Sequence, residues 1–328
     1  HRDLHSFPTR RSSDLGAING AVGGTGNIIK TGANTQVFSG ANSYNGTTTI
    51  NGGTLVFDTT TNATVLSTST ALGLGGGTFQ LKGASGAARS QTFSGLSVNS
   101  GANVVDANNV AGGTSTTITL GNITRTAGST VDFKASNGAL GSTALVGTTK
   151  ANDASGILGA WATVNGGADF AANNGSNSIV AYTGYTDIDA LSSTIADGTT
   201  SNVRLNTVAN SAGNVALGAT TTNINTLMQN TATAATVDVA GKTLRTGILG
   251  GIVITPTGQA LTIGTAANSG VLTAGGNATN TAGELLLTNS SANTLTINST
   301  VTNNGTGAVA VTKSGGGLTV LSGTNTYT

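Results

Sequence analysis

The stretch "FSGANSYNGTTTINGGTLVF", residues 38–57, carries the pattern that decides the fold. It contains four Gly, four Thr and three Asn, and it ends where the apolar Leu55 and Phe57 occupy alternate positions. Thr favours strands, whereas Gly and Asn favour tight turns with positive φ. Alternation with a period of two predicts a strand with one dry face and one wet face. The stretch therefore predicts short strands joined by corners.

The same alternation recurs along the chain in "GTFQLK" (77–82), "STVDFK" (129–134) and "TLTINS" (294–299). Glycines mark a longer repeat of 24 residues, the spacing between Gly53, Gly77 and Gly101. Several short strands within such a period are typical of a β-solenoid, in which stacked coils bury one continuous narrow core. We predict an all-β fold, a right-handed parallel β-helix or β-solenoid rod of about 13 coils at ordinary strand spacing. An amyloid-like stack and a β-sandwich are the alternatives.

Composition excludes several classes of protein. Only 8% of the 328 residues are charged, 50 are Gly, and none is Cys, so disulfides and thiolate metal sites are excluded. Residues 16–328 contain ten Lys or Arg and ten Asp or Glu, which gives no basic face for nucleic acid. No run of 18 apolar residues is present, so we expect no membrane span.

The first fifteen residues, "HRDLHSFPTRRSSDL", differ from the rest of the chain. They contain both His, one of the two Pro and five charged residues, and no apolar segment of a signal peptide follows them. They resemble translated adapter sequence. We therefore expect residues 1–15 to be a non-native leader whose deletion leaves folding unchanged, and residues 16–328 to form the solenoid.

The end of the chain repeats a segment near its beginning. "KSGGGLTVLSGTNTYT" (313–328) aligns without a gap to "KTGANTQVFSGANSYN" (30–45), with seven identical positions. The segment from Lys30 resembles the passenger-associated transport repeat of bacterial autotransporters, also called the autotransporter-associated β-strand repeat. The residues that carry this resemblance are Lys30, Gly32, Gly40, Asn42, Tyr44, Gly46, Thr48, Ile50, Gly53, Thr54 and Leu55. The first copy departs from the pattern at Asn34 and Gln36.

The resemblance implies an exported parallel β-helix passenger at the cell surface, or outside the cell, of a Gram-negative-type bacterium. It also implies a C-terminal outer-membrane barrel. We expect the chain to be an internal fragment that continues into further repeats and a C-terminal barrel or another anchor. Tyr44 and Tyr327 are expected to pack at equivalent places in their coils.

Residues 151–203 differ in composition from the rest of the native part. They contain five Asp and no Lys or Arg, together with the only Trp of the chain. We predict a decorated coil or an insertion here. Aromatic rings beside acidic loops suit sugar rings or cationic partners. The predicted contact surface consists of Trp161, Tyr182, Tyr185, Asp187 and Asp189. In the alternative interpretation, Trp161 and Phe170 fill a wider coil.

Signals for catalysis are weak. "AGKT" (240–243) ends like a phosphate-binding loop, but Thr236 stands where that motif needs its first Gly. A β-helical polysaccharide-degrading enzyme needs clustered carboxylates and a base. The chain offers one Glu, Glu284, and no Lys or Arg between Lys150 and Arg204. We expect no enzyme, no catalytic, cofactor-binding or metal residues, and no cofactor.

The sequence thus favours a secreted or surface-displayed structural passenger stalk with a role in adhesion. Its expected partner is a cell-surface or glycan ligand. A carbohydrate-binding surface module is the first alternative, and a β-helical polysaccharide-degrading enzyme is the second.

Overall fold

The computed structural model describes residues 17–63, 66, 68–210 and 212–328, so the predicted leader lies outside the described residues. The described residues form strands, turns and bends without a helix. Parallel strands stack as a β-solenoid of about 10 turns, which confirms the predicted fold class. The expected number of coils was too high, because some turns are long: Gly251 pairs with Leu286, 35 positions further along. No helix in the described part of the chain is long and apolar enough to cross a membrane.

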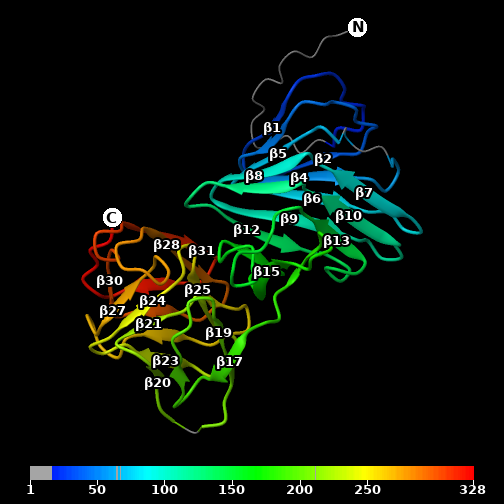
Figure 1. Ribbon diagram of the computed structural model, residues 1–328. Coiled ribbons are helices and arrows are strands. Elements are labelled where there is room, and N and C mark those ends of the chain that lie inside the picture. The colour runs from blue at the N-terminus through cyan, green and yellow to red at the C-terminus, as the bar shows by residue number, and fades with distance from the viewer. Residues whose placement is uncertain (1–16, 64–65, 67, 211) are drawn as a thin grey trace. The chain divides into compact units, whose positions relative to one another are not determined.

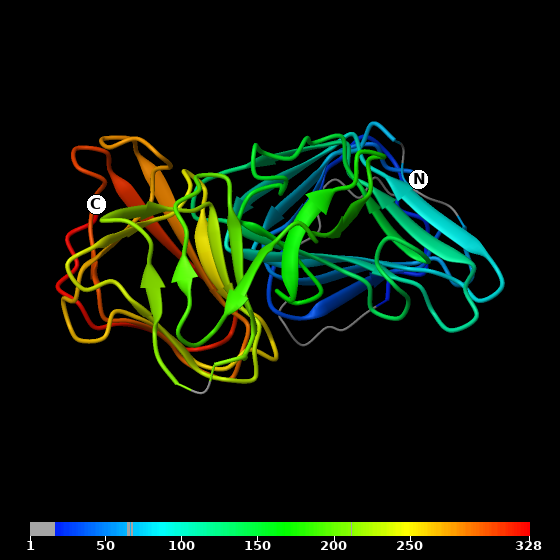
Figure 2. The same cartoon turned by 60° about the horizontal axis from the view of Figure 1, so that its bottom comes forward.

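The chain divides into two compact units, which we call unit 1 and unit 2. Unit 1 comprises His1–Ala151 and Asn173–Val180, and unit 2 comprises Asn152–Ala172 and Ala181–Thr328. Figure 1 labels many of the strands of each unit, and Figure 2 shows the same ribbon turned by 60°, in which the strands can be followed by colour.

Three parallel sheets form the faces of the coils in unit 1 (Figure 1). The first sheet contains β1 (Ile28–Lys30), β3 (Thr48–Ile50), β5 (Leu72–Gly75), β8 (Gly95–Ser100) and β11 (Asn122–Arg125). The second contains β2 (Thr35–Phe38), β4 (Gly53–Asp58), β6 (Gly77–Lys82), β9 (Ala102–Asn108) and β12 (Thr130–Lys134). The third contains β7 (Ala88–Thr92), β10 (Ser115–Thr119) and β13 (Ala144–Gly147).

The alternating pattern read from the sequence sets the register of these sheets. Gly53 pairs with Gly77, so Leu55 lies beside Phe79 and Phe57 beside Leu81. The inward residues of "GTFQLK" are buried while their neighbours are half-buried. Aromatic rings contact one another along the core. Phe38 and Phe57 stack with centroids 5.9 Å apart, and the pairs Phe57–Phe79 and Phe79–Phe93 meet edge to face at 5.1 Å each.

Three short strands follow β13 and do not keep the coil period. They are β14 (Ala162–Val164), β15 (Asp169–Asn173) and β16 (Ile179–Ala181). β14 and β15 pair antiparallel, with Val164 opposite Asp169. The turn between them contains Asn165 with φ 53° and Gly166 with φ 75°. The loop has four residues between the paired Val164 and Asp169, and its third residue, Gly167, also has a positive φ of 83°. Asn and Gly are the residues that adopt this left-handed conformation at the least cost.

Unit 2 is again built from three parallel sheets. The first contains β17 (Thr186–Asp189), β19 (Asn202–Thr207), β22 (Thr226–Gln229), β25 (Gly251–Ile254), β28 (Gly283–Asn289) and β31 (Val309–Ser314). The second contains β18 (Thr194–Ile195), β20 (Val215–Leu217), β23 (Ala235–Asp238), β26 (Leu261–Ile263), β29 (Leu295–Ile297) and β32 (Thr319–Leu321). The third contains β21 (Thr221–Asn223), β24 (Thr243–Arg245), β27 (Val271–Thr273) and β30 (Thr300–Val301).

A narrow apolar interior runs through the coils of unit 2. Leu261, Leu295 and their neighbours Ile263 and Ile297 form ladders in which like residues stack on like. All four are fully buried. The predicted inward direction of Leu295 and Ile297 is therefore confirmed.

Candidate functional site

Charged and aromatic side chains of unit 2 gather around Arg204 on β19. Its guanidinium binds Asp187 on β17 through two hydrogen bonds, Nε to Oδ1 at 2.7 Å and Nη2 to Oδ2 at 3.0 Å. Arg204 Nη1 lies 3.9 Å from Oδ1 of Asp169 on β15. The guanidinium carbon lies 4.3 Å from the centre of the Tyr185 ring, which is a cation–π contact. We call Asp169, Tyr182, Tyr185, Asp187 and Arg204 the Arg204 cluster.

The two tyrosines lie in the irregular link between β16 and β17. Their rings meet edge to face with centroids 4.9 Å apart. The Tyr182 hydroxyl donates to the carbonyl oxygen of Gly184 at 2.8 Å, and the Tyr185 hydroxyl accepts from the backbone N–H of Phe170 at 3.1 Å. Burial raises the pKa of Tyr185. Both rings are half-buried, so each presents part of its surface to solvent.

The carboxylates of the cluster differ in environment. The hydrogen bonds from Arg204 hold the pKa of Asp187 below its ordinary value. Burial raises the pKa of Asp169, although Arg204 and the Tyr185 hydroxyl oppose that shift. Asp187 is the more exposed of the two, with 39% of its side chain accessible against 28% for Asp169. The outer carboxylate is therefore the one that Arg204 keeps ionised to lower pH.

Two further residues of the predicted contact surface, Asp189 and Trp161, are not among the five residues of the Arg204 cluster. Desolvation raises the pKa of Asp189, but backbone N–H groups of Leu191, Ala209 and Asn210 bind its carboxylate and bring the pKa below its ordinary value. Trp161 is 2% exposed, so its ring lies in the interior. Phe170 is likewise fully buried.

Arg204 was missed by reasoning from the sequence. The sequence has no Lys or Arg between Lys150 and Arg204, whereas the coil register pairs Asp187 directly with Arg204. A coil of 17 residues separates them. The short spacing of 17 positions between β17 and β19 was the only sign in the sequence that Arg204 could lie beside Asp187. No group of three or more His, Cys, Asp or Glu that could hold a metal ion occurs among the described residues.

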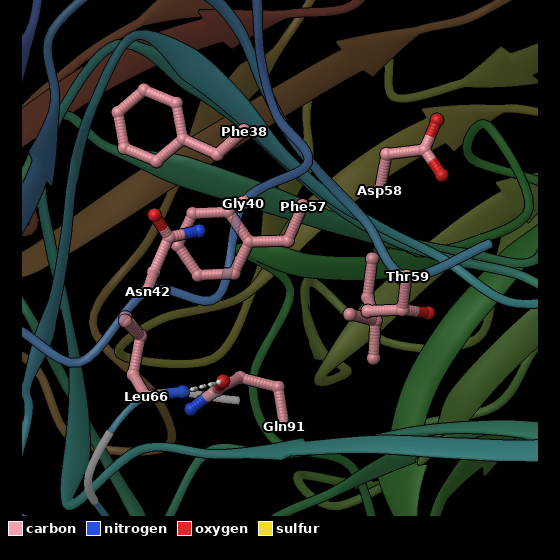
Figure 3. Close-up of a pocket in the computed structure, with 9 residues that line it drawn as sticks. Phe38, Gly40, Asn42, Phe57, Asp58, Thr59, Leu66 and Gln91 are labelled. Atoms are coloured by element: carbon pink, nitrogen blue, oxygen red, sulfur yellow. Dashed lines mark hydrogen bonds between the residues drawn. The ribbon is translucent and has the colours of Figure 1, made fainter. Parts of the chain in front are cut away.

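Unit 1 contains a small hollow, which we compare with the Arg204 cluster as a possible ligand site (Figure 3). Its volume is about 10 Å³, which is room for about one water molecule. Gln91 and Leu66 lie next to each other at its edge, where the Gln91 side-chain oxygen accepts from the Leu66 backbone N–H at 2.8 Å. The lining residues are Phe38, Gly40, Asn42, Phe57, Asp58, Thr59, Leu66, Leu81 and Gln91. This hollow is too small for a sugar ring.

The two copies of the repeated segment make matching contacts, each within its own unit. Asn42 Oδ1 accepts from the backbone N–H of Val22 at 3.1 Å, and Asn325 Oδ1 accepts from that of Val301 at 2.9 Å. In both copies the donor belongs to the preceding coil. The residue after each Asn donates to the same Val, as Ser43 N to Val22 O and Thr326 N to Val301 O.

The lysine at the head of each copy binds the corner that follows it, and Lys30 also binds the corner of the next coil. Lys30 Nζ donates to the carbonyl oxygens of Gly32 at 2.8 Å and of Gly52 at 3.0 Å. Lys313 Nζ donates to the carbonyl oxygen of Gly315. Gly32 and Gly315 have φ values of 75° and 77°, a conformation that favours glycine. The repeat therefore fixes a corner with its lysine and stacks on the preceding coil with its asparagine.

The tyrosines of the repeat have structural partners. Tyr44 is 1% exposed, and its hydroxyl lies 2.8 Å from Oγ1 of Thr48. Tyr327, at the equivalent position, is partly buried and packs against the interior of unit 2. The expectation that both tyrosines pack within their coils is confirmed.

Comparison with known proteins agrees with these contacts. The passenger-associated-transport-repeat family matches residues 28–57 and 311–328. The chain is 35% identical over 291 residues to the "Adhesin BmaC autotransporter" of Brucella suis biovar 1 (strain 1330). That alignment covers 87% of this chain and 8% of the relative, so the chain spans a small part of the relative's length. No solved structure matches. With the stacked parallel coils and the paired repeat contacts, these similarities identify the chain as an autotransporter passenger with passenger-associated transport repeats.

Proposed function

We propose that the chain is a cell-surface β-solenoid passenger that contributes to adhesion and has no catalytic activity. The observation that carries this proposal is the 35% identity, over most of the chain, to a protein named as an adhesin. The stacked coils suit the role, because a solenoid presents long rows of side chains along its faces. Display outside a Gram-negative-type bacterium is part of the proposal and is supported by the repeat family.

The Arg204 cluster is the contact surface that we propose within unit 2. Tyrosine rings can lie against the apolar face of a sugar, and a carboxylate can accept hydrogen bonds from its hydroxyl groups. Asp187 is ionised and 39% exposed beside Tyr185. Asp189 lies two residues further along the same strand. With Asp189 added to the Arg204 cluster, the proposed surface contains four of the five residues predicted from sequence, all except Trp161.

The charge balance of the cluster favours binding over acid–base chemistry. The Arg204 guanidinium is already engaged by Asp187 and lies near Asp169. An arginine remains protonated at all ordinary pH values and does not serve as a base. We therefore propose a binding module for glycans rather than a polysaccharide-degrading enzyme.

The proposal can be tested with the full chain on a glycan array and on host-type cells. Tyr182→Ala and Asp187→Asn should each lower binding at least tenfold while the melting temperature changes little. Tyr327→Ala is the matched control, because it removes a partly buried tyrosine outside the cluster. Binding that both cluster variants retain would show that this surface is not the adhesive one. Release of reducing sugar from any bound glycan would instead support the enzyme.

A further inference from the structure

A row of polar side chains continues the Arg204 cluster from coil to coil. Asn206 lies two residues after Arg204 on β19 and is exposed. Its Nδ2 donates to Oδ2 of Asp187 at 3.4 Å, and its Oδ1 accepts from Nδ2 of Asn230, on the next coil, at 2.9 Å. Asn230 Oδ1 in turn accepts from Thr255 Oγ1, one coil further along, at 3.0 Å. We call Asp187, Asn206 and Asn230, which stand on three successive coils, the asparagine row.

The hydrogen bonds of the row all run in one direction, towards the ionised carboxylate of Asp187. A side-chain amide nitrogen carries two N–H groups, and each asparagine uses one of them within the row. Because Asn206 is exposed, its second N–H is accessible to a ligand. The row thus presents a donor on one coil beside an acceptor on the coil before it. Hydroxyl groups both donate and accept, so a ligand rich in hydroxyl groups fits this surface.

The row is bounded by parts of the sheet that a ligand cannot reach. On β22 and β25, Leu227 and Ile252 belong to the interior cluster, so the residues that follow them point to the outer face. Those residues, Met228 and Val253, are nevertheless only 0% and 1% exposed. At the far end of the row, Thr255 is 1% exposed. The accessible part of the row is therefore limited to its three members.

The row runs along the stack of coils and not along a strand. Neighbouring coils are separated by the distance between paired strands, about 4.8 Å. An extended polysaccharide advances by a similar length for each sugar residue, so a chain laid along the row would place successive sugars on successive coils. The Tyr185 ring, which lies against Arg204 at one end of the row, offers an apolar surface to one of these sugars.

The charge of this surface opposes the binding of acidic sugars. Asp169 and Asp187 both lie near Arg204, and Asp189 follows on the same strand as Asp187. The Arg204 guanidinium is already bound by Asp187, and the Arg204 cluster has no second cation to pair with a carboxylate or sulfate group of a ligand. Like charges brought together across an interface are unfavourable. The surface therefore suits an uncharged glycan.

We propose that the Arg204 cluster and the asparagine row form one strip, which binds an internal segment of an uncharged, linear polysaccharide. The chain lies along the stack, with about one sugar residue on each coil at the strand spacing. Asn206 and Asn230 determine the preference for a chain over a single sugar. This inference rests on the proposed binding of glycans, and it adds the class of glycan and the direction in which the chain lies.

The experiment measures how binding depends on glycan length and charge. The full chain is screened on an array of neutral linear oligosaccharides from glucan, mannan, galactan and chitin, together with sialylated and sulfated glycans. Titration calorimetry then gives Kd for each length of the best neutral series. The affinity should rise about tenfold from the disaccharide to the tetrasaccharide and then level off, because each added coil contributes a few hydrogen bonds. Sialylated and sulfated glycans should bind more weakly than neutral glycans.

Variants of the row separate its role from that of the tyrosines. Asn230→Ala should lower the affinity for the tetrasaccharide about five- to tenfold, the value of one or two hydrogen bonds, and leave that for the disaccharide unchanged. Tyr182→Ala should lower both affinities. Asn277→Ala is the matched control, because it removes an exposed asparagine of unit 2 that lies outside the row. Equal melting temperatures show that the variants are folded alike.

The outcomes distinguish this inference from the proposed function on which it rests. If glycans bind with equal affinity at every length, or if Asn230→Ala weakens both lengths equally, glycan binding stands and the strip is wrong. A preference for sialylated or sulfated glycans would likewise overturn the strip and keep glycan binding. If no glycan of any series binds, the proposed ligand class and the strip are both wrong.

Discussion

At the scale of single residues, Arg204 shows how one guanidinium serves two unlike carboxylates. It binds Asp187 with a bidentate geometry and lies 3.9 Å from Asp169. A bidentate Arg–carboxylate pair is the strongest form of exposed ion pair, although exposure and salt still limit its contribution. The more buried Asp169 loses hydration without gaining equally good hydrogen bonds.

The two carboxylates should respond oppositely to pH. Burial raises the pKa of Asp169, so the folded protein gains stability as the pH falls through that raised value towards 3.8. Arg204 lowers the pKa of Asp187, so its contribution is present above 3.8 and is lost as the pH falls through the lowered value.

We therefore expect Asp169→Asn to leave stability at pH 7 unchanged or higher, and to abolish the gain on mild acidification. Asp187→Asn should cost about 0.5 kcal/mol at pH 7, because the pair is partly exposed. Urea unfolding at a series of pH values measures both effects. A large loss from Asp169→Asn at pH 7 would contradict this assignment of the two environments.

The glycines of the repeat are required by close approach between coils. A Cβ on Gly40 would lie 2.2 Å from the carbonyl oxygen of Gly20, and one on Gly323 would lie 2.4 Å from that of Ser299. Because the obstacle is backbone of the preceding coil, it cannot move aside as a side chain would.

Gly40→Ala and Gly323→Ala should each destabilise the protein by about 1–3 kcal/mol, the usual cost of overpacking. Gly316→Ala is the matched control, since a Cβ there meets no atom within 4 Å. It should change stability by less than about 0.5 kcal/mol. Thermal unfolding of the three variants is the measurement, and equal effects in all three would refute the stacking role of the repeat glycines.

At the scale of elements, the aromatic column of unit 1 concentrates the packing of β2, β4 and β6. Phe79 is fully buried and meets Phe57 and Phe93 edge to face at 5.1 Å. Such pairs contribute beyond the area that they bury. β6 therefore carries the ring, Phe79, that contacts both Phe57 and Phe93.

Phe79→Ala should destabilise the protein by about 3–5 kcal/mol, through lost transfer energy and the cavity left in a narrow core. Thr54→Ala, on the neighbouring strand, should cost under about 1 kcal/mol because its side chain is half-buried and points away from the column. Chemical denaturation gives both values. A small loss for Phe79→Ala would mean that the column collapses to fill the space.

Period-two alternation made the elements predictable, because it depends only on which face of a strand is dry. The directions of Phe79, Leu81, Leu295 and Ile297 follow from it and are confirmed. The structure of the segment Asn152–Ala172 was not predictable, although the composition of residues 151–203 marked the region. Outward residues such as Met228 and Val253 look like ordinary interior residues in sequence, and nothing local shows that a distant segment covers them. Arg204 was missed because its neighbour Asp187 is set by the length of the coil between them, which the sequence does not show, and not by closeness along the chain.

At the scale of the whole molecule, parallel ladders between coils replace the local hydrogen bonds of helices. The far-ultraviolet circular dichroism of the full chain should therefore show a strand spectrum. Soluble proteins average roughly 30–35% helix, so a helical content above about a quarter would contradict the fold. A chain from which residues 1–15 are deleted provides the comparison, and we expect the same spectrum and melting temperature.

The stability of the chain should not depend on metal ions or cross-links. Its sequence contains no Cys, so a reductant has no disulfide to break. The described residues hold no cluster of potential metal ligands, and buried apolar ladders such as Leu261–Leu295 run through the coils instead. Burial of apolar area at about 25 cal/mol per Å² accumulates with each coil that stacks on its neighbour. We expect 5 mM EDTA (on the order of the excess normally used against tightly bound ions) and dithiothreitol to leave the melting temperature unchanged. A melting temperature that falls with EDTA and recovers with added calcium would show that the coils are held together by a bound ion, and not by stacking alone.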